Sequence, residues 1–269
     1  MAKIDILLPY WGEFTLFKQA VGSVLAQTET DWNLLIFEDH YPSLEASEYI
    51  KKLNDPRIKY HRHDKNLGIT KNFNFAVEQA QSRYCSILGG DDVMLPSYIA
   101  RALLMIGSAD FYQPNVQPID KNSQPYLPLV DRMKRYLRPK KQGVHSGEQL
   151  ATSLCRGNWL YFPSIVWKTA TIKNYPFDPQ YKIVEDVVVE LDMIIDGKTL
   201  YVDNTTTFQY RRFAESLSSK EKGKLGVRFK EEADVYDKFA DKFKQIGWHQ
   251  ASRAARMRVI SRINQAISR

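Results

Sequence analysis

The sequence is poor in cysteine and has no long apolar run, and both shortages narrow the kind of protein it can be. Cys85 and Cys155 are the only cysteines among 269 residues, so we expect no disulfide framework and favour a reducing, cytoplasmic setting. No apolar run approaches the roughly 18 residues that are needed to span a bilayer. The first five residues show no signal-peptide layout and lead directly into a predicted strand.

Two glycine-rich phosphate-binding motifs are also missing. The sequence contains neither the dinucleotide fingerprint G-x-G-x-x-G nor the phosphate loop that ends in Gly-Lys-Ser/Thr. We therefore expect any phosphate group to be held by a metal ion or by side chains, and not by a cradle of glycine N–H groups.

The net charge of +7 is concentrated at the end of the chain. Residues 242–269 contain seven Lys and Arg residues and no Asp or Glu, which leaves 31 basic and 31 acidic residues in the first 241. A neutral body argues against a nucleic-acid-binding protein, and a basic tail suggests an anionic partner of its own.

This tail contains a predicted basic amphipathic helix. Its apolar positions are Met257, Ile260, Ile263 and Ile267, and its arginines are Arg253, Arg256, Arg258 and Arg262. Such a helix can make a peripheral contact with the inner face of an anionic membrane. Packing on the body, or pairing with a second subunit in a homodimer, explains the apolar stripe equally well.

Regular alternation of strand and helix patterns dominates the first 110 residues. Strands are predicted at 4–9, 32–37, 58–61 and 84–88, and helices at 14–27, 44–53, 66–80 and 98–106. This order predicts an α/β fold with a parallel sheet covered by helices. Later we expect strands at 110–116 and 199–210, an extended segment at 159–167, and helices at 147–155, 185–195 and from 228 onward. Residues 121–143 have no clear period and are predicted to be a functional or mobile loop.

Two adjacent carboxylates, Asp91 and Asp92, follow the strand at 84–88 directly after two glycines. Loops at the carboxyl ends of strands are where open α/β sheets bind ligands. Neighbouring carboxylates repel each other, so this pair would gain from a cation, typically Mg²⁺ or Mn²⁺ that carries phosphate. A turn that only caps the next helix is an equally weighted alternative.

Other candidate residues follow the first two strands. The loop at 10–13 contains Tyr10, Trp11 and Glu13, and Asp39 ends the second strand. In a parallel sheet these strand ends share one edge with Asp91 and Asp92. We expect a nucleotide there, with an aromatic ring stacked on the base and Asp39 accepting a hydrogen bond from a base N–H group.

A second acidic pair, Glu185 and Asp186, precedes three valines at the predicted start of a helix. A carboxylate near this positive end could act as a general base on a substrate hydroxyl. From spacing alone, simple N-terminal helix capping is the stronger interpretation.

Six segments, in their order along the chain, resemble the motifs of a known protein family. They are IDILLPYW at 4–11, SVLAQT at 23–28, NLLIFED at 33–39, NLG at 66–68, GDD at 90–92 and ED at 185–186. Together they resemble the motifs of family 2 glycosyltransferases of the GT-A fold. The resemblance covers about residues 4–215 and implies a GT-A sheet, mostly parallel and Rossmann-like, flanked by helices. It implies an inverting transferase with a nucleotide-sugar donor, most commonly a UDP-sugar, and a divalent metal.

The resemblance also implies residue roles. Base and ribose contacts would come from Pro9, Tyr10, Trp11, Glu13, Asp39, Asn66, Lys71 and Asp91. Asp91 and Asp92 would hold the metal, and Asp186 would be the catalytic base. Asn158, Trp159 and Glu185 fall in the part of the family that meets the acceptor, a glycan or a lipid-linked sugar in cell-surface polysaccharide or glycolipid synthesis. Because lipid-linked acceptors are common in the family, we favour membrane contact for the basic tail.

Several positions depart from the family pattern. Trp11 replaces a usual Asn, Gly89 replaces the first Asp of the metal motif, and Phe213 stands where His is common. We therefore expect weak metal binding, with Arg211 or Arg212 carrying part of the diphosphate charge, although both arginines could be plain surface cations. The same departures support a rival hypothesis, a non-catalytic module that binds a sugar nucleotide or a glycan.

We divide the expected fold into three parts. Residues 1–110 would form the nucleotide-sugar-binding half, residues 111–227 the acceptor-binding and catalytic half of the same domain, and residues 228–269 a basic helical extension.

Overall fold

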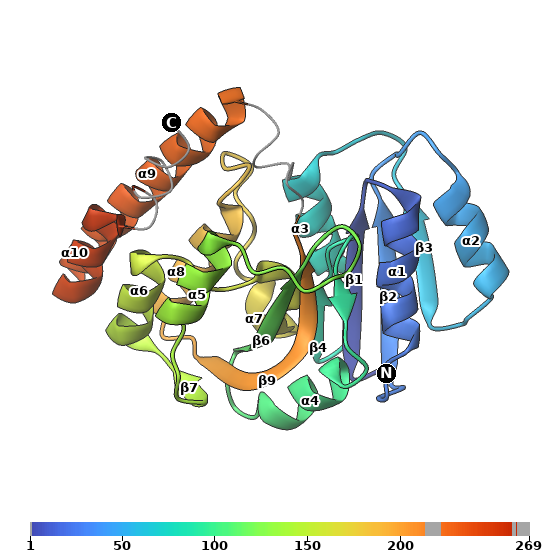
Figure 1. Ribbon diagram of the computed structural model, residues 1–269, viewed down its shortest axis with the longest axis horizontal. Coiled ribbons are helices and arrows are strands. Elements are labelled where there is room, and N and C mark those ends of the chain that lie inside the picture. Colours follow the sequence, from blue (N-terminus) through green and yellow to red (C-terminus); the bar gives the residue numbers. More distant parts are fainter. Residues whose placement is uncertain (1, 213–221, 260–261, 263–269) are drawn as a thin grey trace.

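The computed structural model describes residues 2–212, 222–259 and 262, and it has one sheet with helices on both faces (Figure 1). Nine strands form this sheet in the order β3-β2-β1-β4-β8-β6-β9-β5, and β7 pairs with β9. The parallel part consists of β1 (Ile4–Tyr10), β2 (Trp32–Glu38), β3 (Ile58–Arg62) and β4 (Tyr84–Ile87). Helices α1 (Phe14–Leu25), α2 (Glu45–Leu53) and α3 (Ile69–Gln79) connect these strands.

The apolar runs of these strands reflect burial on both faces. Along β1, Ile4, Ile6 and Leu8 join the core beneath α1, α2 and α4, whereas Leu7 joins the core that α3 covers. A strand that is buried on both sides needs apolar residues at every position. The prediction that the first four strands form a parallel sheet is confirmed.

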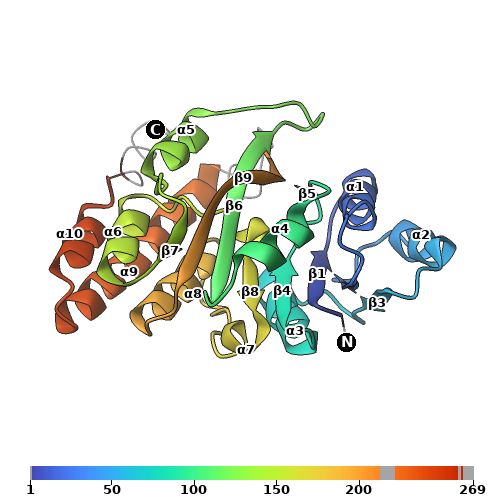
Figure 2. The ribbon, with the colours of Figure 1, turned by 90° about the horizontal axis from the view of Figure 1, so that it is seen from below.

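The second half of the sheet is mixed (Figure 2). Strand β8 (Val166–Lys168) is antiparallel to both β4 and β6 (Phe111–Ile119), and β6 is parallel to β9 (Leu200–Arg211). The short strands β5 (Val93–Met94) and β7 (Gly143–His145) pair with β9 in antiparallel fashion. This pairing brings the end of β9 beside the Asp91-Asp92 turn.

The prediction for residues 121–143 is wrong. The segment contains α5 (Leu129–Leu137) and β7. Helix α4 (Tyr98–Met105) lies where it was predicted. Two smaller differences are the short strand β5 before it, which was not predicted, and a 3₁₀ turn (Phe162–Ser164) before β8 in the segment at 159–167. A four-residue helix, α7 (Thr169–Ile172), follows β8.

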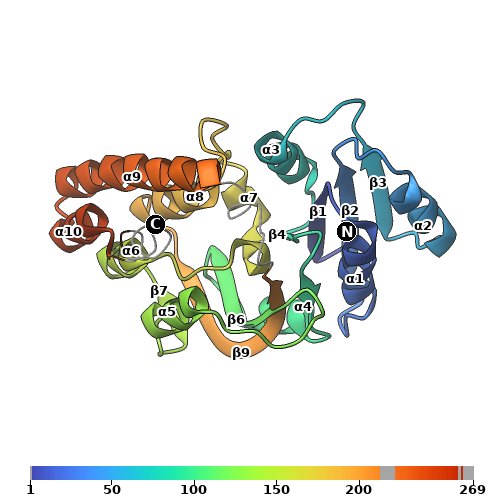
Figure 3. The same cartoon turned by 45° about the horizontal axis from the view of Figure 1, so that its top comes forward.

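Two C-terminal helices, α9 (Lys222–Gln245) and α10 (His249–Met257), pack beside α6 (Gly147–Arg156) and α8 (Glu185–Ile195), as Figure 3 shows. Phe239 and Phe243 of α9 and Ala251 of α10 belong to the same buried cluster as Trp159. The described part of the extension is therefore built into the core.

The predicted membrane-binding stripe lies partly beyond the described residues. Ile260, Ile263 and Ile267 fall outside them, and Met257 is exposed. The described helix α10 packs through Ala251, Ala254 and other small residues, so membrane contact by this tail stays a prediction. Within the described ranges, no helix is long and apolar enough to cross a membrane.

Candidate functional site

The carboxyl ends of β1, β2 and β4 lie side by side, as the sequence predicts. Tyr10 is in register with Glu38, and the Asp39 N–H donates to the Tyr10 carbonyl oxygen over 2.8 Å. On the other side of β1, the Leu88 N–H donates to the Leu7 carbonyl oxygen over 2.8 Å. The loops that follow these three strands therefore share one edge of the sheet.

Asp39 organises the neighbouring turn at residues 66–68. Its carboxylate accepts the N–H groups of Leu67 at 2.6 Å and Gly68 at 2.9 Å, and the Asn66 amide donates to the Asp39 carbonyl oxygen at 3.0 Å. Gly68 has φ +83°, which L-residues with a side chain rarely adopt. Each carboxylate oxygen has more than one acceptor site, so Asp39 can hold this turn and still accept another donor. Lys71 is exposed on α3 just beyond the turn.

Of the two aromatic residues at the end of β1, Tyr10 and Trp11, only Trp11 presents its ring to solvent. Tyr10 is buried, donates its hydroxyl to the Gly12 carbonyl oxygen at 2.8 Å and packs on Phe17 with ring centroids 4.3 Å apart. Trp11 is 56% exposed and lies edge-on to Tyr41. Trp11 can therefore stack on a base, whereas Tyr10 is buried under the loop and stabilises it through its hydrogen bond to Gly12. Pro9 is half-buried, and Glu13 is exposed at the start of α1.

The Asp91-Asp92 turn keeps two carboxylates in a poorly solvated place. Asp92 is buried, and one of its carboxylate oxygens accepts the Arg211 N–H at 2.8 Å. Burial, and then repulsion by Asp91, raise the pKa of Asp92 well above its usual range. The pKa of Asp91 is also raised by burial, against the opposing effect of the Arg211 charge. A bound cation would relieve both effects, because it favours the charged form of each carboxyl group.

Gly89 leaves room for these carboxylates. A Cβ atom at position 89 would lie 2.5 Å from Asp92 Oδ2 and 3.2 Å from Asp91 Oδ1. The two oxygens therefore approach the place where the family's first aspartate would begin. A side chain at position 89 would therefore have to displace the Asp92 carboxylate from its present place.

The turn fits a divalent cation as a partial ligand set. Oxygen ligands suit Mg²⁺ and Mn²⁺, and Asp91 and Asp92 supply them from one turn. Among the described residues no group of three His, Cys, Asp or Glu side chains could hold a metal ion. A cation at this turn would thus need the rest of its ligands from a phosphate group and from water.

Arg211 is a structural clip in this arrangement. Its guanidinium donates to the Asp91 carbonyl oxygen at 2.7 Å, to the Gln19 side chain at 2.8 Å and to the Asp120 carbonyl oxygen at 2.9 Å. It makes two longer contacts to Lys121 and Ser123. The residue is 3% exposed. Arg211 is therefore not a surface cation, and a role for it in carrying part of the diphosphate charge stays a prediction.

Arg212 lies closer to solvent and pairs with a carboxylate that sequence analysis missed. Its guanidinium donates to both oxygens of Asp131 on α5, at 2.9 and 2.7 Å, and it lies over the Tyr210 ring. Asp131 is fully buried and also accepts the Tyr161 hydroxyl at 2.6 Å. About a fifth of the Arg212 side chain is exposed (21%), so this cation can meet an anionic ligand with its remaining surface. Phe213 lies outside the described residues.

Glu185 and Asp186 occupy the first turn of α8, after Val184 at the N-cap position. Asp186 is half-buried and accepts the Val187 N–H at 2.8 Å. Burial raises its pKa, and the Val187 hydrogen bond and the Lys134 charge oppose that rise. Burial, followed by repulsion from Asp186, raises the pKa of Glu185 to about 7.

A hydrogen-bonded chain connects α5 to α8 beneath this pair. Lys134 Nζ donates to the Leu160 carbonyl oxygen at 2.6 Å, and the Leu160 N–H donates to the Asn158 side chain at 2.9 Å. The Asn158 amide in turn donates to Glu190 at 3.0 Å, one helical turn beyond Asp186. Burial, followed by repulsion from Arg212, lowers the pKa of Lys134 to about 8. Sequence analysis missed Lys134 and Glu190, whose only signal was their helical spacing from Asp131 and Asp186.

Trp159 does not serve as a platform for a sugar ring. It is 1% exposed, and its indole N–H donates to the Ser153 hydroxyl at 3.0 Å. Of the two interpretations left open by the sequence, acceptor contact or core packing, the structure supports core packing. Asn158 lies in the hydrogen-bonded chain just described.

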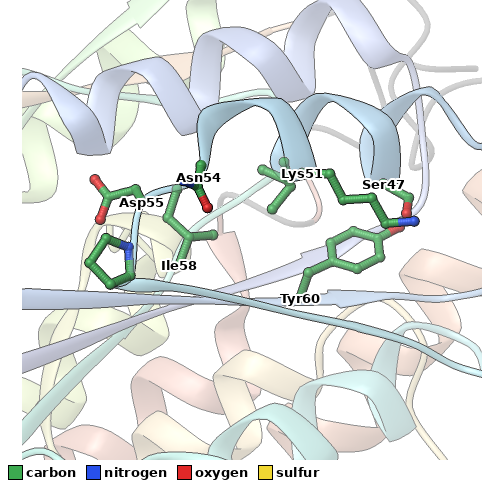
Figure 4. Close-up of a pocket in the computed structure, with 8 residues that line it drawn as sticks. Ser47, Lys51, Asn54, Asp55, Ile58 and Tyr60 are labelled. Atoms are coloured by element: carbon green, nitrogen blue, oxygen red, sulfur yellow. The ribbon is translucent and has the colours of Figure 1, made fainter.

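A surface hollow of about 700 Å³ lies elsewhere, between α2 and β3 (Figure 4). Its lining comes from residues 47–60 and includes Lys51, Asp55 and Tyr60. No predicted site residue lines it. The site is thus defined by strand ends and helix starts, and not by this hollow.

Comparison with known proteins agrees with this geometry. Residues 5–169 match the model of Glycosyl transferase family 2. WcaA of Escherichia coli K12, named as a glycosyl transferase of colanic acid biosynthesis, is 28% identical over 250 residues, 89% of this chain and 82% of WcaA. WfgD of Escherichia coli, named as a UDP-Glc:α-D-GlcNAc-diphosphoundecaprenol β-1,3-glucosyltransferase, is 24% identical over 123 residues, 45% of this chain and 48% of WfgD.

Solved structures share the fold at low sequence identity. The TarS structure from S. aureus in complex with UDP-GlcNAc has a TM-score of 0.67 at 13% identity, over 87% of this chain and 65% of that one. The mannosyltransferase PcManGT from Pyrobaculum calidifontis, in complex with GDP-Man and Mn²⁺, has a TM-score of 0.64 at 10% identity, over 99% of this chain and 74% of that one. The expected GT-A architecture is confirmed, and the chain belongs to glycosyl transferase family 2.

Proposed function

We propose that this protein transfers a sugar, with inversion, from a nucleotide-sugar donor to a hydroxyl group of an acceptor. The observation that carries the proposal is that the end of β9 connects the Asp91-Asp92 turn with the helix that lies beside Asp186. The Arg211 N–H holds Asp92, and the next residue, Arg212, holds α5, whose Lys134 acts on Asp186. This connection supports our assignment of a departing diphosphate to the Asp91-Asp92 turn and of a base to Asp186.

The donor site is proposed for the edge formed by β1, β2 and β4. Trp11 offers an exposed ring face, Asp39 an acceptor and Lys71 a cation. A UDP-sugar and hexosyl transfer are our first choices, and the named activity of WfgD and the UDP-GlcNAc complex of TarS support them. A divalent cation bound to Asp91 and Asp92 would neutralise charge on the leaving diphosphate, and the Mn²⁺ complex of PcManGT supports this assignment.

The role of Asp186 is that of the general base. Its carboxylate accepts the proton of the acceptor hydroxyl while the acceptor oxygen bonds to the anomeric carbon of the donor. The bond from that carbon to the diphosphate oxygen breaks, and the electron pair leaves with the diphosphate. The transition state resembles an oxocarbenium ion, as in glycoside hydrolysis. The Val187 hydrogen bond and the Lys134 charge favour the ionised form of Asp186 and oppose the rise in pKa that burial causes.

For the acceptor we propose a glycan or a lipid-linked sugar in cell-surface polysaccharide or glycolipid synthesis. The names of WcaA and WfgD support this choice, because one refers to colanic acid and the other to a diphosphoundecaprenol acceptor.

The test begins with calorimetric titration of UDP, dTDP and GDP, each with and without Mn²⁺. We expect micromolar binding of one nucleotide that weakens without metal and is lost in Asp92→Asn. Asp186→Asn should keep that binding and lose donor hydrolysis and transfer, whereas Asp234→Asn, an exposed carboxylate on α9, should behave as wild type. Nucleotide binding by a wild-type protein that turns over no donor would favour the non-catalytic module. Absence of nucleotide binding would reject the transferase and a module that binds sugar nucleotides, and would leave only a module that binds glycans.

A further inference from the structure

Helix α5 faces the protein with its polar side. Asp131 binds Arg212, Lys134 donates to the Leu160 carbonyl oxygen, and Arg138 donates to the Asp203 carbonyl oxygen. These three residues recur at the spacing of one helical face. The usual surface helix buries an apolar stripe. In α5, Leu137 packs against the core, but the one buried residue of the helix is the carboxylate Asp131.

The outward side of α5 and the loop before it are accordingly apolar. Tyr136 is 82% exposed, Leu129 55%, Tyr126 49% and Leu127 37%. Scattered exposed apolar residues are ordinary, but a concentration of them in one short segment marks an interaction surface.

Positive charge surrounds these side chains. Arg132 and Arg135 are exposed on α5, and Arg132 shares the outward face with Leu129 and Tyr136. Residues 121–141 contain seven Lys and Arg residues and a single acidic residue, Asp131, which is buried against Arg212. The exposed part of this segment is therefore basic and apolar, without an exposed carboxylate.

We propose that this face, the α5 surface (Tyr126, Leu127, Leu129, Arg132, Arg135 and Tyr136), docks on an anionic lipid bilayer. Exposed aromatic and leucine side chains enter the boundary between headgroups and acyl chains, and Arg or Lys beside them attract anionic lipids. Tyrosine in particular suits this interfacial level. Figure 2 shows α5 at the edge of the molecule, at the end away from α2 and β3.

Docking would have a consequence for substrate access. On its inner side α5 carries Lys134, which is connected through Leu160 and Asn158 to α8, the helix of the proposed base. The bilayer would therefore cover the outer side of a helix that is linked to the helix of the base. An acceptor sugar on a lipid diphosphate could then reach the base without leaving the membrane. This consequence rests on the proposed function, whereas the docking surface itself rests on exposure and charge.

Vesicle co-sedimentation of the full chain tests the surface. The vesicles contain phosphatidylcholine alone or with about one third phosphatidylglycerol. We expect binding only to the anionic vesicles, with a loss at high salt. Arg132→Glu/Arg135→Glu should weaken binding at least tenfold, and Leu129→Ser/Tyr136→Ser several-fold. All four side chains point outward, and unchanged thermal unfolding verifies that the variants fold.

Two controls match these variants. Leu104→Ser removes a leucine of α4 that is more exposed than Leu129 (73% against 55%), and Lys51→Glu/Lys52→Glu reverses two exposed charges on α2. Both should bind vesicles as the wild type does. A third variant, Arg253→Glu/Arg256→Glu, tests the C-terminal tail.

Three results would overturn the proposal: a wild-type protein that ignores anionic vesicles, α5 variants that bind normally, or binding that is lost only in the tail variant. Each is independent of the transferase reaction. Nucleotide binding in solution, measured on the same α5 variants, shows separately whether the proposed function stands.

Discussion

At the scale of single residues, the two carboxylate pairs, Asp91-Asp92 and Glu185-Asp186, lie in crowded or poorly solvated places. Substitutions at or beside these pairs should therefore change the stability of the protein. Gly89 lies against the oxygens of Asp91 and Asp92, and Glu185 is buried beside Asp186. The crowding at Gly89 and the desolvation of Glu185 can each be measured through the free energy of unfolding.

Gly89→Ala should lower the free energy of unfolding by about 1–3 kcal/mol, because the new methyl group overpacks the Asp92 carboxylate. Urea denaturation measures the change. The matched control is Gly22→Ala in α1, where a Cβ atom would meet nothing within 4 Å and where alanine favours the helix. Equal stability of Gly89→Ala and wild type would contradict the crowding seen at this turn.

Glu185→Gln should stabilise the protein above pH 7. The folded-state pKa of Glu185, raised from the usual 4.5 to about 7, means that the native state holds a proton which the unfolded state has released. The stabilisation from that proton is complete below the unfolded pKa and disappears as the pH rises through about 7. Relative to wild type, the variant should gain up to about 3 kcal/mol between pH 4 and pH 8. Unfolding at both pH values measures the gain, and the same measurement on Glu13→Gln, at an exposed position, serves as the control.

At the scale of elements, most helices and strands could be predicted from hydrophobic periodicity, and helix α5 is the main exception. The strands at β1 and β2 and the helix α8 lie where the sequence predicts them, because continuous or periodic apolar residues face a core. Helix α5 was not predicted, because its buried position is the polar Asp131 while Leu129 and Tyr136 are exposed, so its sequence shows no clear apolar stripe. The strand-end candidates were found from the α/β order, but Asp131 and Lys134 could not be found without α5.

Lys134→Met should shift the pH dependence of catalysis. The Lys134 charge lowers the pKa of Asp186, so its removal raises that pKa and leaves less of the ionised base at a given pH. The acidic limb of the kcat/KM profile should therefore move to higher pH, with donor binding little changed. Lys134→Arg should restore part of the wild-type profile, and the exposed Lys141→Met serves as the control. An acidic limb that stays in place would exclude an electrostatic role for Lys134.

At the scale of the whole molecule, two buried clusters lie on opposite faces of one sheet, and α9 and α10 complete one of them. The sequence predicted helices in this region, but their amphipathic pattern could not distinguish packing on the body from contact with a membrane or a second subunit. The buried Phe239 and Ala254 show packing on the body for the described part.

Phe239→Ala should destabilise the entire chain by about 3–5 kcal/mol, since Phe239 is fully buried in the larger cluster. If the two clusters unfold together, tryptophan fluorescence and nucleotide binding should be lost at the same urea concentration, lower than in wild type. Ile246→Ala, which truncates a 46% exposed side chain, should leave the midpoint almost unchanged. Nucleotide binding that persists after the fluorescence change would mean that the two halves unfold separately.

The Arg211 clip also sets an order of events during synthesis. Its guanidinium reaches Gln19, 192 positions earlier in the chain, and its N–H fixes Asp92, 119 positions earlier. Almost all of the proposed nucleotide contacts lie in the first 92 residues, yet the carboxylate turn cannot reach its final form until residue 211 has left the ribosome. A nascent chain that holds only the amino-terminal half would present an unfinished nucleotide site, so donor binding should be acquired late, together with the acceptor half.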